Sequence, residues 1–289
     1  MAFRTLVIST SSKLELKLNY LIFRTKDDIK RIFLDEVHTV IVQSTAVAVT
    51  AALLCELCSR GIKVVFCDSK NNPCSELVSY YNHHNSPKII RSQMEWNLKY
   101  TPYIWKNIVE NKIYNQMRVL KKYDKEEYLL LEEYFNDVKN DDITNREGHA
   151  AKVYFNCLFY EGFTRSDDCY INMALNYGYA ILLSQINREI VSYGYLTQLG
   201  IHHKNEYNFF NLSCDLMEPF RPIIDDKVKE LSDTSDIKKE MQDLFNITVI
   251  IDNSKQTFVN AIKIYVLSVL RAIGEENVKL IKNYTNYEI

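Results

Sequence analysis

The hydrophobic pattern of this chain changes about a quarter of the way along, and the change limits the folds that the chain can adopt. The first quarter carries short β-branched or alternating apolar runs, which are typical of strands. These runs span residues 5–9, 13–23, 31–34 and 39–42. A helical stretch at 46–60 ends at Gly61, and a further strand-like run follows at 62–67. We therefore predict a small β-sheet domain with one helix over residues 1–78.

From Lys88 onward, apolar residues recur at steps of three and four, as in amphipathic helices. The periodic segments span residues 89–100, 104–122, 125–138, 148–159, 171–192 and 254–281. A polar stretch that includes Asn82-His-His-Asn-Ser predicts a linker at 79–87. The expected fold class is α+β, with the β domain followed by a larger all-α domain at 88–289.

Composition and charge restrict the possible functions of the 289-residue chain. An apolar fraction of 47% and a charged fraction of 25% indicate an ordinary protein with a substantial core. The net charge of -2 gives no global attraction to nucleic acid, so DNA binding would require local basic patches. No signal peptide is visible, and polar residues interrupt the most apolar window, at 40–57. We expect a cytoplasmic protein with no membrane partner.

The seven cysteines predict free thiols rather than a disulfide scaffold, because their number is odd and their positions are scattered. Cys55 and Cys58 have the spacing of a zinc half-site. However, both lie at the end of an apolar helical run, and no second pair with this spacing follows. We therefore favour structural thiols that the helix buries.

A first group of polar residues surrounds Glu147. Thr144-x-x-Glu147 has the pattern of a capping box, and a carboxylate also suits the positive end of a helix dipole. Alternatively, Glu147 points into a site as a metal ligand, and Arg146 binds a phosphate beside it. The residues by themselves favour the cap.

A second group combines a histidine pair with two carboxylates that follow it closely. Imidazole and carboxylate together can hold a divalent cation and leave positions open for water or phosphate. Adjacent histidines on an extended chain point to opposite sides, so only one of His202 and His203 can face a given ion. Asp215-x-x-Glu218 can instead cap a helix. Arg221 would add a guanidinium for phosphate on the face that carries Glu218.

A third group forms a polar stripe on a predicted core helix. Asn172, Asn176 and Tyr179 lie at steps of four and three residues. Buried polar side chains need hydrogen-bond partners, so the stripe is either a structural network or the lining of a site. We favour the structural network.

A basic strip on the predicted helices is the remaining feature that could contact a phosphate backbone. Its basic residues and interleaved aromatic rings are His83, His84, Lys88, Arg91, Lys99, Lys106, Lys112, Arg118, Trp96, Tyr103 and Trp105. Such a strip can track a nucleic-acid strand, although surface helices carry cations for solubility as well. No phosphate-binding glycine-rich loop or nucleophile elbow is present.

Taken in order, these segments resemble the family of CRISPR-associated protein one, the integrase and endonuclease that inserts new spacers into CRISPR arrays. The matching segments are Arg146-Glu147-Gly148, Leu175-Asn-Tyr-Gly-Tyr179, Gly200-x-x-His203 and Leu212-x-x-Asp215-Leu-Met-Glu218-x-Phe-Arg221-Pro222. The resemblance covers the whole chain. The short length and the residues around Glu147 resemble the variant from systems with a single large effector nuclease (type II).

The resemblance implies a metal site, and it favours ligand roles over caps. Its catalytic metal ligands for Mg²⁺ or Mn²⁺ fall on Glu147, His203 and Glu218, with Asp215 in a supporting position. Candidates for phosphate contact or ligand orientation are Arg146, Asn176, His202 and Arg221. Pro219 lies at a position that varies across the family, which affects the local start of the helix but removes no ligand.

The implied reaction is attack of a DNA 3′-hydroxyl on a phosphodiester, or hydrolysis when water is the nucleophile. The implied partners are the prespacer duplex and the CRISPR repeat. A homodimer would form through the β domain, and two dimers would clasp a dimer of a small ferredoxin-like adaptation partner. Two alternatives remain open: a non-catalytic DNA-binding scaffold of the same adaptation complex, and a helical protein whose motifs are only caps and core networks.

Overall fold

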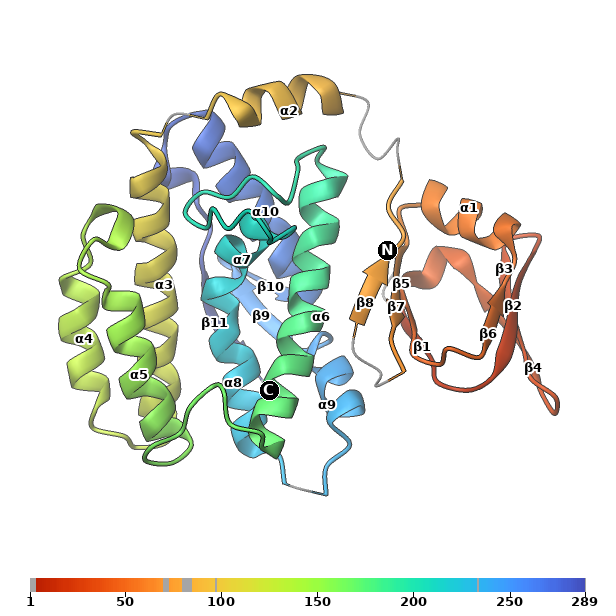
Figure 1. Ribbon diagram of the computed structural model, residues 1–289, viewed down its shortest axis with the longest axis horizontal. Coiled ribbons are helices and arrows are strands. Elements are labelled where there is room, and N and C mark those ends of the chain that lie inside the picture. Colours follow the sequence, from red (N-terminus) through yellow and green to blue (C-terminus); the bar gives the residue numbers. More distant parts are fainter. Residues whose placement is uncertain (1–3, 70–72, 80–84, 97, 233, 289) are drawn as a thin grey trace. The chain divides into compact units, whose positions relative to one another are not determined.

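The computed structural model describes residues 4–69, 73–79, 85–96, 98–232 and 234–288 of the chain. The chain divides into two compact units, Met1–Ser86 and Pro87–Ile289 (Figure 1). A sheet-containing N-terminal part precedes a mainly helical part, which confirms the mixed α+β class. Of the linker expected at 79–87, residues 80–84 lie outside the described residues, and α2 (Ser86–Met94) already includes its last two positions.

The first unit contains two four-stranded sheets. The first has the order β1 (Arg4–Ile8), β5 (Val37–Val42), β7 (Lys63–Cys67) and β8 (Pro73–Glu76). The second has the order β4 (Ile29–Phe33), β3 (Tyr20–Arg24), β2 (Ser12–Lys17) and β6 (Val47–Val49). The pairs β1–β5, β5–β7 and β2–β6 are parallel, and the remaining pairs are antiparallel.

One α-helix, α1 (Ala51–Ser59), accompanies these sheets and begins later than predicted. The β-branched stretch before it pairs with β2 as strand β6, and Thr50 then caps the helix by accepting from the Leu53 N–H (3.4 Å). The helix buries Leu53 and Leu57. Cys55 lies between them in sequence and is exposed, so its predicted burial was wrong. All seven cysteines are free.

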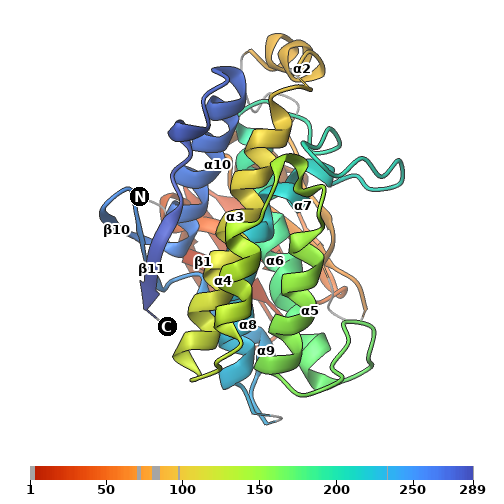
Figure 2. The same ribbon diagram turned by 90° about the vertical axis from the view of Figure 1, so that its left-hand side faces the viewer.

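The second unit packs its helices around one large core. Beyond α2 they are α3 (Thr101–Lys122), α4 (Tyr128–Asn136), α5 (Arg146–Leu158), α6 (Tyr170–Ser192), α7 (Asn211–Met217), α8 (Arg221–Glu230), α9 (Ile237–Leu244) and α10 (Phe258–Gly274). Helices α3, α4 and α5 form one layer, in front of α6 in Figure 2. Short 3₁₀ turns span Leu34–Glu36, Asn140–Asp142, Glu218–Phe220 and Val278–Leu280. No helix in the described part of the chain is long and apolar enough to cross a membrane.

The prediction of an all-α second domain was wrong, because this unit also contains a three-stranded antiparallel sheet. Its order is β10 (Ser254–Thr257), β9 (Thr248–Ile251) and β11 (Tyr284–Glu288). Asp252 and Asn253, at φ 51° and 56°, form the tight turn between β9 and β10. The helix expected at 254–281 therefore begins only at Phe258. Strands of four residues are too short for their period to stand out beside a long helix.

Candidate metal-binding site

Glu147 lies in the first turn of α5, and its side chain is not part of the predicted capping box. The cap is Asp142, whose Oδ1 and Oδ2 accept from the backbone N–H groups of Arg146 (2.8 Å) and Glu147 (2.9 Å). Thr144 Oγ1 is buried and has no hydrogen-bond partner among the described residues. The capping prediction was therefore wrong. Asp142, two residues before Thr144, caps the helix, and this leaves the Glu147 side chain available for other contacts.

Glu218 lies in the 3₁₀ turn between α7 and α8 and is only 4% exposed. The predicted cap by Asp215-x-x-Glu218 was also wrong, because Asp215 lies inside α7. Two cations contact the Glu218 carboxylate: Arg221 Nε is 2.9 Å from Oε1, and Lys112 Nζ is 2.5 Å from Oε2. Burial raises the pKa of Glu218, but these two cations outweigh it and hold the pKa below its ordinary value.

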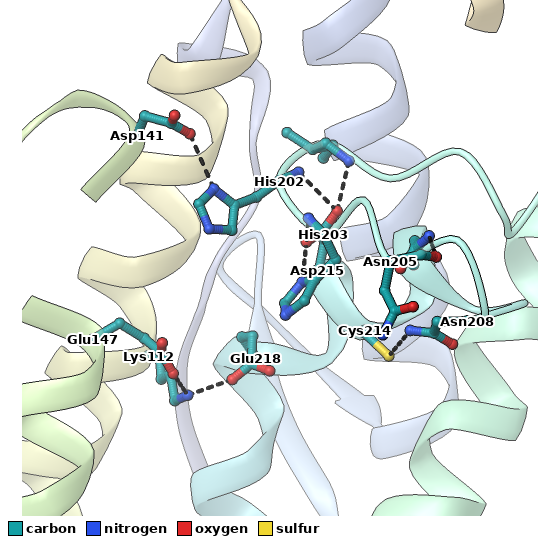
Figure 3. Close-up of polar contacts among 12 residues, drawn as sticks. Lys112, Asp141, Glu147, His202, His203, Asn205, Asn208, Cys214, Asp215 and Glu218 are labelled. Carbon is teal, nitrogen blue, oxygen red and sulfur yellow. Dashed lines mark hydrogen bonds and ion pairs between the residues drawn. The ribbon is translucent and has the colours of Figure 1, made fainter. Parts of the chain in front are cut away.

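Lys112 joins the two predicted carboxylate ligands. Its ammonium group forms an ion pair with Glu147 Oε1 as well as with Glu218 Oε2, and Figure 3 shows it between the two side chains. Burial lowers the pKa of Lys112, but the adjacent carboxylates of Glu218 and Glu147 outweigh it and raise the pKa. Because one ammonium group contacts both carboxylates, the two carboxylates lie close enough together to bind a single positive ion between them.

The ion pairs at Glu218 differ from ordinary buried hydrogen bonds. Both are short, yet neither has hydrogen-bond geometry, so Glu218 Oε2 and Arg221 Nε have no hydrogen-bond partner among the described residues. Buried carboxylate oxygens normally accept hydrogen bonds, and an exception calls for an explanation such as an unoccupied ligand position. Glu218 Oε2 could therefore accept another ligand if the Lys112 ammonium moved away.

His203 is held by Asp215, which is completely buried. Asp215 accepts from the backbone N–H groups of Ile201 (2.6 Å), His202 (3.1 Å) and His203 (3.1 Å), and its Oδ1 lies 2.5 Å from His203 Nδ1. A Cβ at Gly200 would lie 2.4 Å from the His203 carbonyl oxygen and 2.8 Å from Asp215 Oδ2. The close approach of loop and carboxylate therefore requires glycine three residues before His203.

This arrangement suits a metal-binding histidine. Metal ligands of this type commonly donate one ring N–H to a carboxylate, which leaves the other nitrogen for the ion. The hydrogen bond to Asp215 raises the pKa of His203 against the effect of burial, and the charges of Glu218 and Glu147 raise it further. In Figure 3 the His203 ring extends from its loop toward Glu218.

His202 points elsewhere. Its ring stacks on Trp105 with centroids 4.3 Å apart, and its Nδ1 lies 3.0 Å from Asp141 Oδ1. The two histidine rings are perpendicular to each other, at 90°. Asp141 comes from the turn before α5, so His202 links the loop that carries His203 to the segment that leads to Glu147.

Two other phosphate candidates have partners outside this group. Arg146 pairs with Asp137, whose Oδ2 is 2.6 Å from its Nη2, and this guanidinium lowers the pKa of Asp137. Asn176 Oδ1 accepts from Arg165 Nη2 (2.7 Å). Arg221, by contrast, contacts the predicted ligand Glu218 through its Nε. The phosphate-binding roles stay predictions.

The polar stripe on α6 forms the favoured structural network. Asn172 is buried and donates to the carbonyl oxygens of Thr164 and Asp167, both at 2.8 Å. Tyr179 donates its hydroxyl hydrogen to Asp225. Its ring also contacts the Arg221 guanidinium, 4.7 Å from the ring centroid, so the network supports the cation beside Glu218.

Lys112 and Trp105 do not lie on an exposed DNA-binding strip, contrary to the prediction from the sequence. Both are buried, Lys112 against carboxylates and Trp105 under His202. The available signal was that Lys112 continues the apolar positions Ile104 and Ile108 at steps of four. A lysine on an apolar stripe predicts a buried partner of opposite charge.

The residues present fit a divalent cation, although they do not yet form a complete ligand set. Within the described ranges, no group of three or more His, Cys, Asp or Glu side chains is arranged to hold a metal ion. Two carboxylates already share the Lys112 ammonium, however, and the His203 ring extends toward Glu218 in Figure 3. The shared ligand set of Glu147, His203 and Glu218 therefore stays a prediction, and it requires the ammonium of Lys112 to move.

Comparisons with solved structures support the fold. A casposase bound to its integration product has a TM-score of 0.77 at 17% identity, covering 95% of this chain and 92% of its own. A Cas1 protein from Thermotoga maritima has a TM-score of 0.76 at 17% identity, with coverages of 94% and 97%. A Cas6-RT-Cas1–Cas2 complex contains a chain that matches with a TM-score of 0.73 at 18% identity, covering 96% of this chain and 36% of that one.

Sequence comparisons give the family. The CRISPR-associated endonuclease Cas1 of Neisseria meningitidis serogroup C is 33% identical over 242 residues, covering 83% of this chain and 80% of the relative. A Cas1 endonuclease of Francisella tularensis subsp. novicida is 28% identical over 236 residues, covering 74% of each. The family model described as CRISPR associated protein Cas1 matches residues 6–263. The chain therefore belongs to the CRISPR-associated Cas1 family.

Proposed function

We propose that this protein is a metal-dependent DNA integrase and endonuclease that inserts new spacers into a CRISPR array. The observation that carries the proposal is that the carboxylates of Glu147 and Glu218 share one cationic group, the Lys112 ammonium. His203 lies on the adjoining loop. The names of the relatives, which describe endonucleases, and the likeness to a casposase bound to an integration product support it.

The proposed ligands for Mg²⁺ or Mn²⁺ are Glu147, His203 and Glu218. When bound, such an ion polarises a phosphodiester and favours deprotonation of the attacking hydroxyl. Asp215 holds His203 in the tautomer that presents Nε2, and it fixes the loop through three backbone N–H groups. Arg221 partly neutralises Glu218 and is itself fixed against Tyr179.

In the proposed reaction, the 3′-hydroxyl oxygen of the incoming DNA forms a new bond to a phosphorus atom of the repeat. The bond from that phosphorus to the 3′ oxygen of the repeat strand breaks, and the released oxygen takes a proton. The number of phosphodiesters is unchanged, so the step needs no external energy source. With water in place of the hydroxyl, the same residues would cut the strand.

A net charge of -2 gives a single copy little attraction to DNA. In the proposed assembly, several copies can combine their local basic residues into one DNA-binding surface. We propose a homodimer formed through residues 1–78, with two dimers around a dimer of a small ferredoxin-like adaptation partner. Solved complexes that contain Cas1 and Cas2 and resemble this chain in fold support such a partner. The type II variant remains part of this proposal, on the basis of chain length and the residues around Glu147.

A joining assay tests the catalytic role. Purified protein, Mn²⁺ and a short duplex should give half-site products with supercoiled DNA that carries a repeat. Glu147→Ala, His203→Ala and Glu218→Ala should each abolish joining while DNA binding in a gel-shift assay persists. Normal joining by all three variants would refute the site assignment. Wild-type protein that binds DNA but neither joins nor cuts it would favour the non-catalytic scaffold.

A further inference from the structure

We propose that Lys112 is a displaceable counter-ion, which occupies the position of the divalent cation and makes metal binding and DNA binding cooperative. The ammonium would leave Glu218 when the ion enters, and a DNA phosphate would receive it. This inference rests on the proposed function and adds to it a residue outside the predicted ligand set.

The position of Lys112 supports an exchange of cations. Its side chain is 8% exposed, and it reaches from α3 to contact Glu147 on α5 and Glu218 in the turn before α8. Three segments distant in the sequence thus meet at one ammonium group (Figure 3). A divalent cation shared by the two carboxylates would occupy the same space, so Lys112 and the ion cannot both keep these contacts.

The charges at the site explain why displacement would require DNA. Two carboxylates, Glu147 and Glu218, face two cations, Lys112 and Arg221, so the group is balanced without metal. A divalent ion adds two positive charges beside a buried ammonium, and like charges at this range repel strongly in a protein interior. The negative charge of a DNA phosphate removes this repulsion, which couples the two binding events.

The contacts of Lys112 are unequal, and this favours partial release. Its Nζ donates a hydrogen bond to Glu147, whereas its contact with Glu218 lacks hydrogen-bond geometry. Leaving Glu218 would therefore break one ion pair while the hydrogen bond to Glu147 is kept. Lysine is suited to such movement, because its charge is compact and its four-carbon stem is flexible.

Mn²⁺ titration, followed by the electron paramagnetic resonance signal of the free ion, tests the inference. Wild type and Lys112→Met are titrated alone and with a duplex ending in 3′-dideoxynucleotides, after subtraction of Mn²⁺ bound by DNA itself. For the wild type, DNA should tighten Mn²⁺ binding roughly tenfold or more. Lys112→Met should bind Mn²⁺ roughly tenfold more tightly without DNA, and the duplex should tighten its Mn²⁺ binding less than it does for wild type.

Matched variants make the result specific. Lys106→Met removes a lysine from the same helix that pairs with Glu110 (3.5 Å) outside the site, and it should behave like wild type. Lys112→Arg keeps the charge and should retain the coupling. Lys112→Met should also lower the melting temperature of the metal-free protein, because the buried carboxylate of Glu218 and the partly buried one of Glu147 lose a counter-ion. If this variant does not fold, Lys112→Gln replaces it in the same titrations.

The titration distinguishes failure of this inference from failure of the proposed function. If Glu218→Gln leaves Mn²⁺ binding unchanged, the ion binds elsewhere and the proposed metal site is wrong. If binding depends on Glu218 but Lys112→Met binds Mn²⁺ no more tightly than wild type, the counter-ion role is wrong and the metal site stands. A DNA-dependent gain in Mn²⁺ affinity as large in Lys112→Met as in wild type would also overturn the counter-ion role.

Discussion

Two buried carboxylates of the helical unit, Glu218 and Asp226, each pair with a lysine of α3, yet their surroundings differ. Asp226 is completely buried, and each of its oxygens has two hydrogen bonds. Lys122 Nζ donates to Oδ1 (2.9 Å) and Oδ2 (3.0 Å), the Tyr123 hydroxyl donates to Oδ1 (2.8 Å), and the Tyr287 hydroxyl donates to Oδ2 (2.8 Å). Asp226 thereby fastens the C-terminal strand β11 to α3 and α8.

Glu218 is almost equally buried but has an oxygen without a hydrogen bond. Its lysine partner is also different, because the Lys112 side chain is 8% exposed whereas that of Lys122 is 43% exposed. A carboxylate with all its hydrogen bonds satisfied stabilises one structure, whereas one with an unsatisfied oxygen beside a lysine leaves a position that a ligand could take if the lysine moved. The same pair of residue types therefore indicates a structural tie in one place and a binding site in the other.

The largest expected effect is a difference in the free energy of unfolding between variants of Asp226 and of Glu218. Asp226→Asn should reduce the free energy of unfolding by about 3 kcal/mol, because the amide nitrogen cannot accept from the donors that now meet a carboxylate oxygen. Glu218→Gln should cost less than that, because Lys112 keeps its hydrogen bond and ion pair with Glu147. Urea unfolding of both variants in the presence of a metal chelator measures the difference. Equal losses would contradict the distinction between the two carboxylates.

The next effect concerns Asp225, the neighbour of Asp226 in the chain. Burial raises its pKa from 3.8 to about 7, although the Tyr179 hydroxyl and Arg221 oppose the shift. The folded state therefore binds this proton more tightly than the unfolded state, and the resulting stability is lost as the pH rises toward 7. Between pH 5 and pH 8, wild type should lose about 2 kcal/mol more than Asp225→Asn. Urea unfolding at both pH values tests this. Equal losses of stability in wild type and Asp225→Asn would show that a group other than Asp225 is responsible.

The part of the fold that could be predicted from the sequence is the part with long periodic signals. The helical pattern of α3 and α6 extends over 22 and 23 residues, so their positions were predicted closely. The strands β9 and β10 have four residues each, and a signal of that length does not stand out beside the long helix α10. Pairing of distant segments such as β11 with β9 depends on tertiary contacts that local pattern does not encode.

The candidate site was predictable by residue type but not by contact. Carboxylate and imidazole groups, together with the family resemblance, identified Glu147, His203 and Glu218. Lys112 was missed because its spacing was interpreted as a surface strip, although it occupies a buried position of α3. The cap by Asp142 was missed because Thr144-x-x-Glu147 matched the standard capping pattern. The turn that brings the Asp142 carboxylate into range has left-handed backbone at Asp141, Asp142 and Asn145 (φ 60°, 47° and 50°), which the pattern did not predict.

The smallest expected effect compares the two lysines directly. Lys122→Met should cost about 1 kcal/mol, because its charge is partly exposed to water and Asp226 keeps two tyrosine hydroxyls. It should leave Mn²⁺ affinity unchanged, since Lys122 lies ten residues, or about 15 Å, beyond Lys112 along α3. Urea unfolding and the Mn²⁺ titration measure the two quantities. If Lys122→Met tightened Mn²⁺ binding as much as Lys112→Met, loss of any nearby positive charge would explain both results, and a bridging role for Lys112 would not be needed.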